Sequence, residues 1–170
     1  MDWVDEEGEV RDFDTAQVCL DGHTITDVYH RAPQFNQDFC DKCGRPTITA
    51  CPSCQAEIRG LHRDTSYATG GHGTPAPPHF CYGCGKPYPW TESKLRAARD
   101  LADLSESLSD EEKAALKGSL DDIVSDTPRT TVAATRVKAL LLKAGSAIGE
   151  GIRSILVDVA SETAKKTLGL

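Results

Sequence analysis

The stretch FCDKCGRPTITACPSC, residues 39–54, contains two Cys-x-x-Cys pairs separated by seven residues. A third pair follows in FCYGCGKPYPW, residues 80–90, and CLDGH, residues 19–23, adds a lone Cys and a His. Metal binding, thiol–disulfide exchange and structural disulfides all use clustered cysteines. A redox-active Cys-x-x-Cys normally opens a helix within a βαβ unit, and the sequence gives no sign of such a unit around these pairs. Metal binding is therefore the favoured interpretation.

The number of ligands fits two zinc ions. A structural zinc site takes four ligands, usually cysteine thiolates and histidine nitrogens. The chain has seven Cys, and His23 near Cys19 supplies an eighth ligand. His79 and His30 are reserve candidates for the eighth position, whereas His62 and His72 are expected in an exposed loop. We predict two structural Zn²⁺ ions on Cys19, His23, Cys40, Cys43, Cys51, Cys54, Cys81 and Cys84.

Local turn chemistry supports this ligand set. A zinc knuckle aims two side chains at one ion, and Gly44 and Gly85 follow two of the pairs, where positive φ angles are common. Pro52 presets the turn of the pair at residues 51–54 through its fixed φ. Asp21-Gly22 is a hairpin-turn signal flanked by the first two ligands. The two TIT runs, residues 24–26 and 47–49, are predicted to be short strands.

Two ways of pairing the half-sites remain open. Pairing in chain order joins Cys19/His23 to Cys40/Cys43, and Cys51/Cys54 to Cys81/Cys84, with 16 and 26 residues between the half-sites. A cross-brace, as in RING and FYVE domains, would instead join the first half-site to the third and the second to the fourth. Chain-order pairing is favoured, because the RING and FYVE spacings do not match this sequence well.

These motifs carry a resemblance. The order FCxxCG, CPxC, FCxxCG resembles the double zinc-ribbon arrangement of bacterial proteins, and residues 19–92 are similar to a bacterial zinc-ribbon family with no assigned function and a helical C-terminal tail. The first half-site departs from the commonest ribbon form, because Cys-x3-His stands where Cys-x2-Cys is usual. The resemblance implies a fold more than an activity.

Composition changes sharply near residue 90. All seven Cys, all five His and all ten aromatic residues lie in residues 1–90, which carry 7 Lys and Arg against 13 Asp and Glu. Residues 91–170 carry 12 against 13 and are rich in Ala and Leu. The predicted fold is a small, metal-stapled, β-rich double zinc ribbon followed by an α-helical region. Its parts are an acidic arm, the ribbon domain and the helical region, at residues 1–14, 15–90 and 91–170.

The helical region is predicted to contain four helices. Thr91 is a candidate N-cap, Ser109 with Glu112 matches a capping box, and Thr127-Pro128 is a candidate start for the third helix. The last helix is expected over residues 146–168. Two arrangements stay open: a self-contained bundle with a glycine hinge near residue 145, and helices that dock on another molecule.

No enzyme signature emerges from the sequence. Zinc deaminases carry His-x-Glu before Pro-Cys-x-x-Cys, which is absent here, as are a phosphate-binding Gly loop with Lys and a Gly-x-Ser-x-Gly turn. Ligand sets rich in thiolate suit closed structural sites rather than catalytic zinc. The acidic start and the lack of a long apolar stretch argue against a signal peptide and a transmembrane span, and the clustered thiols favour a cytoplasmic location.

The predicted function is a non-enzymatic adaptor that binds a protein partner, with possible self-association through the helical tail. Nucleic-acid binding by the ribbons is a weaker alternative, because the formal charge of the chain is −7. Tyr82, Tyr88 and Trp90 look exposed and able to stack on bases, although such residues more often pack over the knuckles or onto a partner. Two further alternatives are a membrane-surface role for the basic amphipathic residues 129–156 and a RING-like adaptor, which requires the cross-brace.

Overall fold

The computed structural model describes residues 12–62 and 76–170. The chain divides into two compact units, residues 1–91 and 92–170. The division lies one residue from the boundary that composition predicts. Residues 1–11 of the predicted acidic arm and the loop that contains His72 lie outside the described residues.

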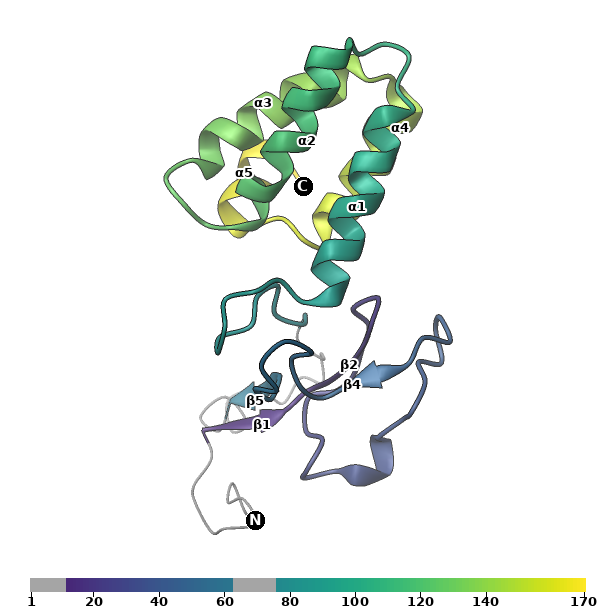
Figure 1. Ribbon diagram of the computed structural model, residues 1–170, viewed down its shortest axis with the longest axis vertical. Helices are drawn as coiled ribbons and strands as arrows, with labels where there is room; N and C mark the ends of the chain where they lie inside the picture. The colour runs from purple at the N-terminus through teal and green to yellow at the C-terminus, as the bar shows by residue number, and fades with distance from the viewer. Residues whose placement is uncertain (1–11, 63–75) are drawn as a thin grey trace. The chain divides into compact units, whose positions relative to one another are not determined.

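The described residues of the first unit contain five short strands. β1 (Phe13–Thr15) pairs antiparallel with β5 (Arg59–His62), and a second sheet has the order β3-β2-β4 (Figure 1). Its members are β2 (Gln17–Cys19), β3 (Thr24–Thr26) and β4 (Thr47–Ile48). Both predicted TIT strands are confirmed as β3 and β4. The arm was expected to continue to residue 14, but its last two residues belong to β1.

Irregular backbone makes up most of residues 12–62 and 76–91, the described part of the first unit. Each strand has only two to four residues, and one 3₁₀ turn, η1 (Pro33–Phe35), follows β3. The unit is therefore β-containing rather than β-rich. His62 was expected in an exposed loop, but it lies in β5, where its ring packs edge-on against Phe13 with centroids 4.6 Å apart.

A small core holds this unit together. Val18, Ile58, Tyr88 and Trp90 are almost completely buried. The rings of Tyr88 and Trp90 stack with centroids 4.6 Å apart, and the Trp90 indole N–H donates to the Pro78 carbonyl at 2.9 Å. Both rings looked exposed in the sequence, but they are buried and pack within the first unit, as such residues more often do, because they fill the core of a unit that has few large aliphatic residues.

Five helices, not four, follow the first unit. They are α1 (Pro89–Asp103), α2 (Asp110–Val124), α3 (Thr130–Lys143), α4 (Ser146–Val157) and α5 (Glu162–Leu168) (Figure 1). The predicted last helix breaks after α4. The Ser161 hydroxyl accepts the Ala164 N–H at 3.3 Å and caps α5, so a Ser in the middle of the expected helix starts a new one. α1 begins at Pro89, two residues before the predicted cap Thr91.

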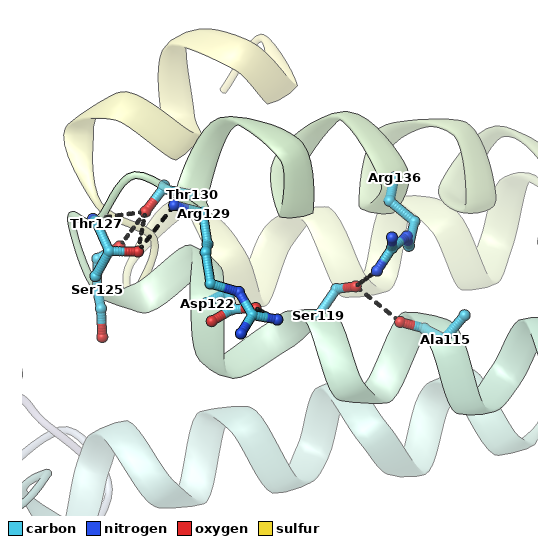
Figure 2. A network of polar contacts seen from close by, with 8 residues as sticks. All are labelled: Ala115, Ser119, Asp122, Ser125, Thr127, Arg129, Thr130 and Arg136. Carbon is cyan, nitrogen blue, oxygen red and sulfur yellow. Dashed lines mark hydrogen bonds and ion pairs between the residues drawn. The ribbon is translucent and has the colours of Figure 1, made fainter.

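The capping predictions for α2 and α3 had different outcomes. Ser109 and Glu112 form the predicted capping box at α2. The third helix, however, begins at Thr130 instead of Pro128. As Figure 2 shows, the Thr130 hydroxyl donates to the Ser125 carbonyl at 2.6 Å and accepts the Thr127 N–H at 2.8 Å. These bonds fix a turn ahead of α3, so residues 127–129 stay outside the helix.

The helices of the second unit enclose their own core. Leu116, Leu120, Ile123, Ile152 and Leu156 have no exposed surface. The apolar side chains of the helices are therefore largely covered within the unit, as the self-contained arrangement requires. Leu104 is an exception at 68% exposed, because α1 ends at the residue before it.

Two glycines shape the join between α3 and α4. Gly145 has φ +93° and separates the helices, at the position where a hinge was expected. Gly149 is buried, and a Cβ atom there would lie 2.6 Å from the Leu141 carbonyl oxygen. The missing side chain thus allows α4 to approach the backbone of α3 closely.

All four basic side chains of residues 127–149 have partners within the second unit. Arg129 pairs with Asp122 at 3.4 Å, Arg136 donates to the Ser119 hydroxyl at 3.4 Å (Figure 2), and Lys143 pairs with Glu112 at 2.6 Å. The Lys138 ammonium donates to a carbonyl oxygen of α5 at 3.1 Å. Among the described residues, no helix is long and apolar enough to cross a membrane.

Candidate metal centres

Three turns of the first unit repeat one backbone geometry. In each Cys-x-x-Cys pair, the N–H of the residue after the second Cys donates to the carbonyl of the first Cys, at 2.8, 2.9 and 2.8 Å in chain order. The N–H of the first Cys donates to the carbonyl two residues after the second Cys, at 2.8, 2.8 and 2.9 Å. The same two hydrogen bonds in all three turns show that the pairs are equivalent knuckles.

A left-handed residue closes each knuckle. Gly44 and Gly85 have φ +72° and +71°, as the sequence indicates. The third knuckle uses Gln55 at the same position with φ +64°, the only positive φ outside glycine among the described residues. An L-residue with a Cβ adopts this conformation at a cost of about 1–2 kcal/mol, so the repeated hydrogen bonds outweigh local strain at Gln55.

The half-site at residues 19–23 reaches a similar result with a hairpin turn. β2 and β3 are antiparallel, and Gly22, with φ +90°, donates its N–H to the Cys19 carbonyl at 2.9 Å. The His23 N–H in turn donates to the Cys19 sulfur at 3.3 Å. The predicted hairpin at Asp21-Gly22 therefore exists, and it turns Cys19 and His23 toward the same point.

The half-sites meet in chain order. The first cluster brings together Cys19, His23, Cys40 and Cys43, and the second contains Cys51, Cys54, Cys81 and Cys84. Within each cluster the ligand atoms all lie within 4.8 Å of one another. The cross-brace alternative would join Cys19 to Cys51, which belong to different clusters here. A RING-like ligand arrangement is therefore absent from the part of the chain that the structure describes.

Five distances between ligand atoms match the edges of a tetrahedron around one ion. In the first cluster, His23 Nδ1 lies 3.5 Å from Cys19 Sγ and 3.6 Å from Cys40 Sγ, and Cys19 Sγ lies 3.7 Å from Cys43 Sγ. In the second cluster, the Sγ–Sγ distance is 3.8 Å for Cys51–Cys84 and 3.6 Å for Cys54–Cys81. All seven cysteines are free thiols in the structure.

Burial divides each knuckle in the same way. The first cysteine of every pair is buried, namely Cys40, Cys51 and Cys81, whereas the second is exposed. Cys19 is buried as well, and His23 is half-buried. Both clusters thus sit at the edge of the core, with one side toward the hydrophobic interior and the other toward solvent.

The knuckle backbone prepares the buried thiols to act as thiolates. Burial raises the pKa of the Cys81 thiol, but N–H groups of Cys84 and Gly83 donate to its sulfur and bring the pKa down to about 6. The pKa of Cys40 is lowered in the same way, with burial opposed by the N–H groups of Lys42 and Cys43. Two equivalent positions therefore favour the charged form that binds metal.

The exposed thiols behave in the opposite way. An N–H of Ala56 lowers the pKa of Cys54, but burial and hydrogen bonds to neighbouring sulfurs raise it to about 12. For Cys43 an N–H of Arg45 has the lowering effect, and burial and the sulfurs of Cys40 and Cys19 raise the pKa to about 11. Adjacent thiolates, three in the first cluster and four in the second, repel one another, so full deprotonation of a cluster needs a cation at its centre.

The reserve histidines lie outside both clusters. His30 Nε2 is 3.4 Å from a carboxylate oxygen of Glu57. The His79 carbonyl accepts hydrogen bonds from the Tyr88 N–H and the Thr91 hydroxyl, and its imidazole is not part of a ligand group. Among the described histidines, only His23 is in place to complete a cluster.

A buried amide that the sequence analysis did not identify supports the first cluster. Gln17 Nε2 donates to the Gln37 carbonyl at 2.7 Å and to the Thr47 hydroxyl at 2.9 Å, and its Oε1 accepts the Gln37 N–H at 3.0 Å. These bonds anchor the loop that leads into Cys40. A single polar residue in a short strand gives no signal in sequence that could have identified this contact.

A family model matches most of the chain. Residues 12–168 match the family described as an uncharacterized protein conserved in bacteria (DUF2321). No curated protein and no solved structure matches the chain.

Proposed function

The chain belongs to the DUF2321 family of uncharacterised bacterial proteins, and we propose that it is a non-enzymatic, zinc-stapled adaptor whose first unit recognises a protein partner. In this proposal, two Zn²⁺ ions are structural, and the helical second unit serves assembly. The proposal treats the first unit as a double zinc ribbon, in which each half-site contributes two ligands to one ion.

The observation that carries the zinc assignment is the spacing of the ligand atoms. Zn–S bonds of about 2.3 Å in a tetrahedron place sulfurs roughly 3.8 Å apart, and a Zn–N bond of about 2.0–2.1 Å places nitrogen roughly 3.6 Å from sulfur. The Sγ–Sγ distances of 3.6 to 3.8 Å and the Nδ1–Sγ distances of 3.5 and 3.6 Å agree with these values. Soft thiolates also favour zinc over the hard cations Mg²⁺ and Ca²⁺.

A structural role follows from the ligand count. Each cluster supplies four protein ligands, which fill a tetrahedral zinc and leave no position for water. The first unit also has a core that is too small for a unit of this size to be stable without further cross-links. Two ions linking distant parts of the chain would provide them, on the order of 10 kcal/mol each.

Exposed aromatic residues support a role in protein recognition. Phe39 and Phe80 each stand immediately before the first Cys of a knuckle and are 64% and 36% exposed. Aromatic side chains are enriched at protein interfaces, whereas the acidic balance of residues 1–90 disfavours nucleic acid. The four basic residues of the segment 127–149 are engaged within the second unit, which argues against their use on a membrane surface.

Zinc removal tests the structural role. The reporter is Trp90, which is 2% exposed in the first unit, studied in a Trp3→Phe background so that it is the sole tryptophan. We expect a strong chelator to shift Trp90 fluorescence to the red as the first unit unfolds, while the far-UV helical signal of the second unit persists. Unchanged Trp90 fluorescence in protein shown to be metal-free would reject zinc as a structural staple.

The adaptor role needs a separate experiment. Affinity capture from a bacterial lysate would compare the zinc-loaded chain with its Phe39→Ser/Phe80→Ser variant, whose zinc content should be unchanged. We expect a partner protein that the wild-type chain enriches and the variant does not. Retention that nuclease abolishes, or equal enrichment by both chains, would contradict the proposal.

A further inference from the structure

A cavity of about 300 Å³ opens beside β1 and β5 in the first unit. Six of its lining residues have aromatic or charged side chains: Asp12, Phe13, Asp14, Glu57, Arg59 and Tyr82. None of these six belongs to either cysteine cluster, although Tyr82 lies inside the knuckle that Cys81 and Cys84 form. The cavity is large enough to accept one amino-acid side chain.

The aromatic walls of the cavity already hold a cation. The Arg59 guanidinium carbon lies 3.9 Å from the centroid of the Tyr82 ring and 4.7 Å from that of Phe13. These are cation–π contacts, in which positive charge rests on the electron-rich faces of the two rings. Because Arg59 and Tyr82 are both exposed, the guanidinium can move away and leave the ring faces free.

A buried carboxylate in the wall lacks part of its hydrogen bonding. Asp14 is 4% exposed. Its Oδ1 accepts the Thr15 N–H at 2.7 Å and the His30 N–H at 3.2 Å, whereas Oδ2 is buried without a hydrogen-bond partner. A buried carboxylate oxygen without a donor is costly, so a donor that reaches Oδ2 would bind favourably.

The charges of the residues that line the cavity indicate which class of ligand it can bind. The lining contains three acidic residues and one basic residue, and one of the acidic residues, Glu57, also lies 3.4 Å from the His30 imidazole. Residues 1–90 as a whole have 7 basic against 13 acidic residues. The carboxylates do not converge as a metal site requires, because the two cysteine clusters are the only ligand groups found among the described residues. An extended organic cation with N–H donors therefore fits better than a metal ion.

We propose that this cavity is a receptor for an arginine side chain of a partner polypeptide, and that Arg59 is its internal competitor. The incoming guanidinium replaces that of Arg59 between Phe13 and Tyr82 and donates to the Asp14 carboxylate. Arginine fits better than lysine because a planar guanidinium stacks on both rings and still donates from its edge. This inference rests on the adaptor function proposed above and specifies the chemistry of the partner.

Peptide titration of the full-length, zinc-loaded chain tests the receptor. The probe is acetyl-Gly-Arg-Gly-amide, and the matched control replaces Arg with citrulline, which has the same shape and no charge. We expect saturable amide chemical-shift changes at Phe13, Asp14, Arg59 and Tyr82, at peptide concentrations on the order of millimolar. The citrulline peptide should bind at least about tenfold more weakly, because its uncharged group forms neither an ion pair with the carboxylate nor a cation–π contact.

Substitutions expected to weaken peptide binding are compared with one expected to strengthen it, because a general loss of structure could only weaken binding. Asp14→Asn should weaken the Arg peptide about tenfold or more, and Tyr82→Leu about two- to fivefold. Arg59→Ala should strengthen it about threefold or more, since it removes both the competitor and a repelling charge. Asp41→Asn, an equal charge change on an exposed residue of another knuckle, should leave affinity unchanged.

Three results would overturn the receptor: no saturable shift with the Arg peptide, equal affinity for the citrulline peptide, or an Arg59→Ala variant that binds no more tightly. Zinc content measured on the same samples separates this failure from failure of the proposed function. A folded chain with two zinc ions that ignores the peptide rejects the arginine receptor alone. A chain without zinc rejects the zinc-stapled adaptor itself.

Discussion

Each knuckle ends at a residue whose backbone is in the left-handed conformation, and adding one methyl group at Gly85 tests whether the knuckle needs that conformation. Gly85 has φ +71°, and a Cβ atom built there meets no other atom within 4 Å. Gly85→Ala therefore creates no clash, and its cost comes from the backbone conformation alone. That cost is about 1–2 kcal/mol. Because folding of a knuckle is linked to metal binding, we expect zinc affinity at the second cluster to fall about 5- to 30-fold.

Competition against a chromophoric zinc chelator at neutral pH would measure this loss. Gln55→Gly provides the converse test, because Gln55 occupies the equivalent position with φ +64° and glycine relieves the strain. This variant should bind zinc more tightly, by up to about fivefold. The control is Gly118→Ala on the exposed face of α2, where the new Cβ also meets nothing within 4 Å. It should stabilise the helices by about 1 kcal/mol without changing zinc affinity. Gly85→Ala with wild-type affinity would refute the knuckle geometry.

Three further predictions concern the helices and the first cluster. Gly149→Ala should destabilise the second unit by about 2 kcal/mol in denaturant unfolding, because the new Cβ would lie 2.6 Å from a backbone oxygen of α3. The control is Gly151→Ala, whose Cβ would meet only the flexible end of a leucine side chain at 3.2 Å. This variant should be as stable as the wild-type chain or more stable. The Lys143 ammonium and the Ser109 N–H hold the pKa of Glu112 below its ordinary value. The ionised Glu112 side chain therefore contributes its full share of folding stability above roughly pH 4.3, the ordinary pKa of a glutamate. This contribution is lost as the pH falls through the pKa of Glu112 in the folded chain. Glu112→Gln should therefore unfold more easily at neutral pH and lose less stability on acidification, and equal acid sensitivity in both chains would contradict the contact. His23→Ala should reduce zinc from two ions per chain to one, and His23→Cys should retain two; two ions in His23→Ala would remove His23 from the ligand set.

Sequence was most informative where chemistry constrains the backbone locally. The paired cysteines, the glycines after two of them and the Asp21-Gly22 turn each require a particular short-range geometry, and the structure contains those turns. The capping box of α2 was recognisable for the same reason, since both of its partners lie within four consecutive residues.

Features that depend on distant contacts were harder to predict. Tyr88 and Trp90 follow the last knuckle in a polar, proline-rich stretch, and only the stacked core shows that they are buried. The break between α4 and α5 contains no glycine or proline. Because apolar residues continue at helical spacing across residue 158, the sequence predicted one helix where the structure has two. The cavity joins residues 12–14, 57–59 and 82, whose proximity depends on strand pairing and on the knuckle.

The most direct test of the account is elemental zinc per chain, measured on protein purified without added metal. The geometry of the two clusters predicts two zinc ions per chain, with all seven thiols protected from alkylation until the metal is removed. Protein that is folded and contains no zinc, with thiols that react at once or have oxidised to disulfides, would contradict the central claim.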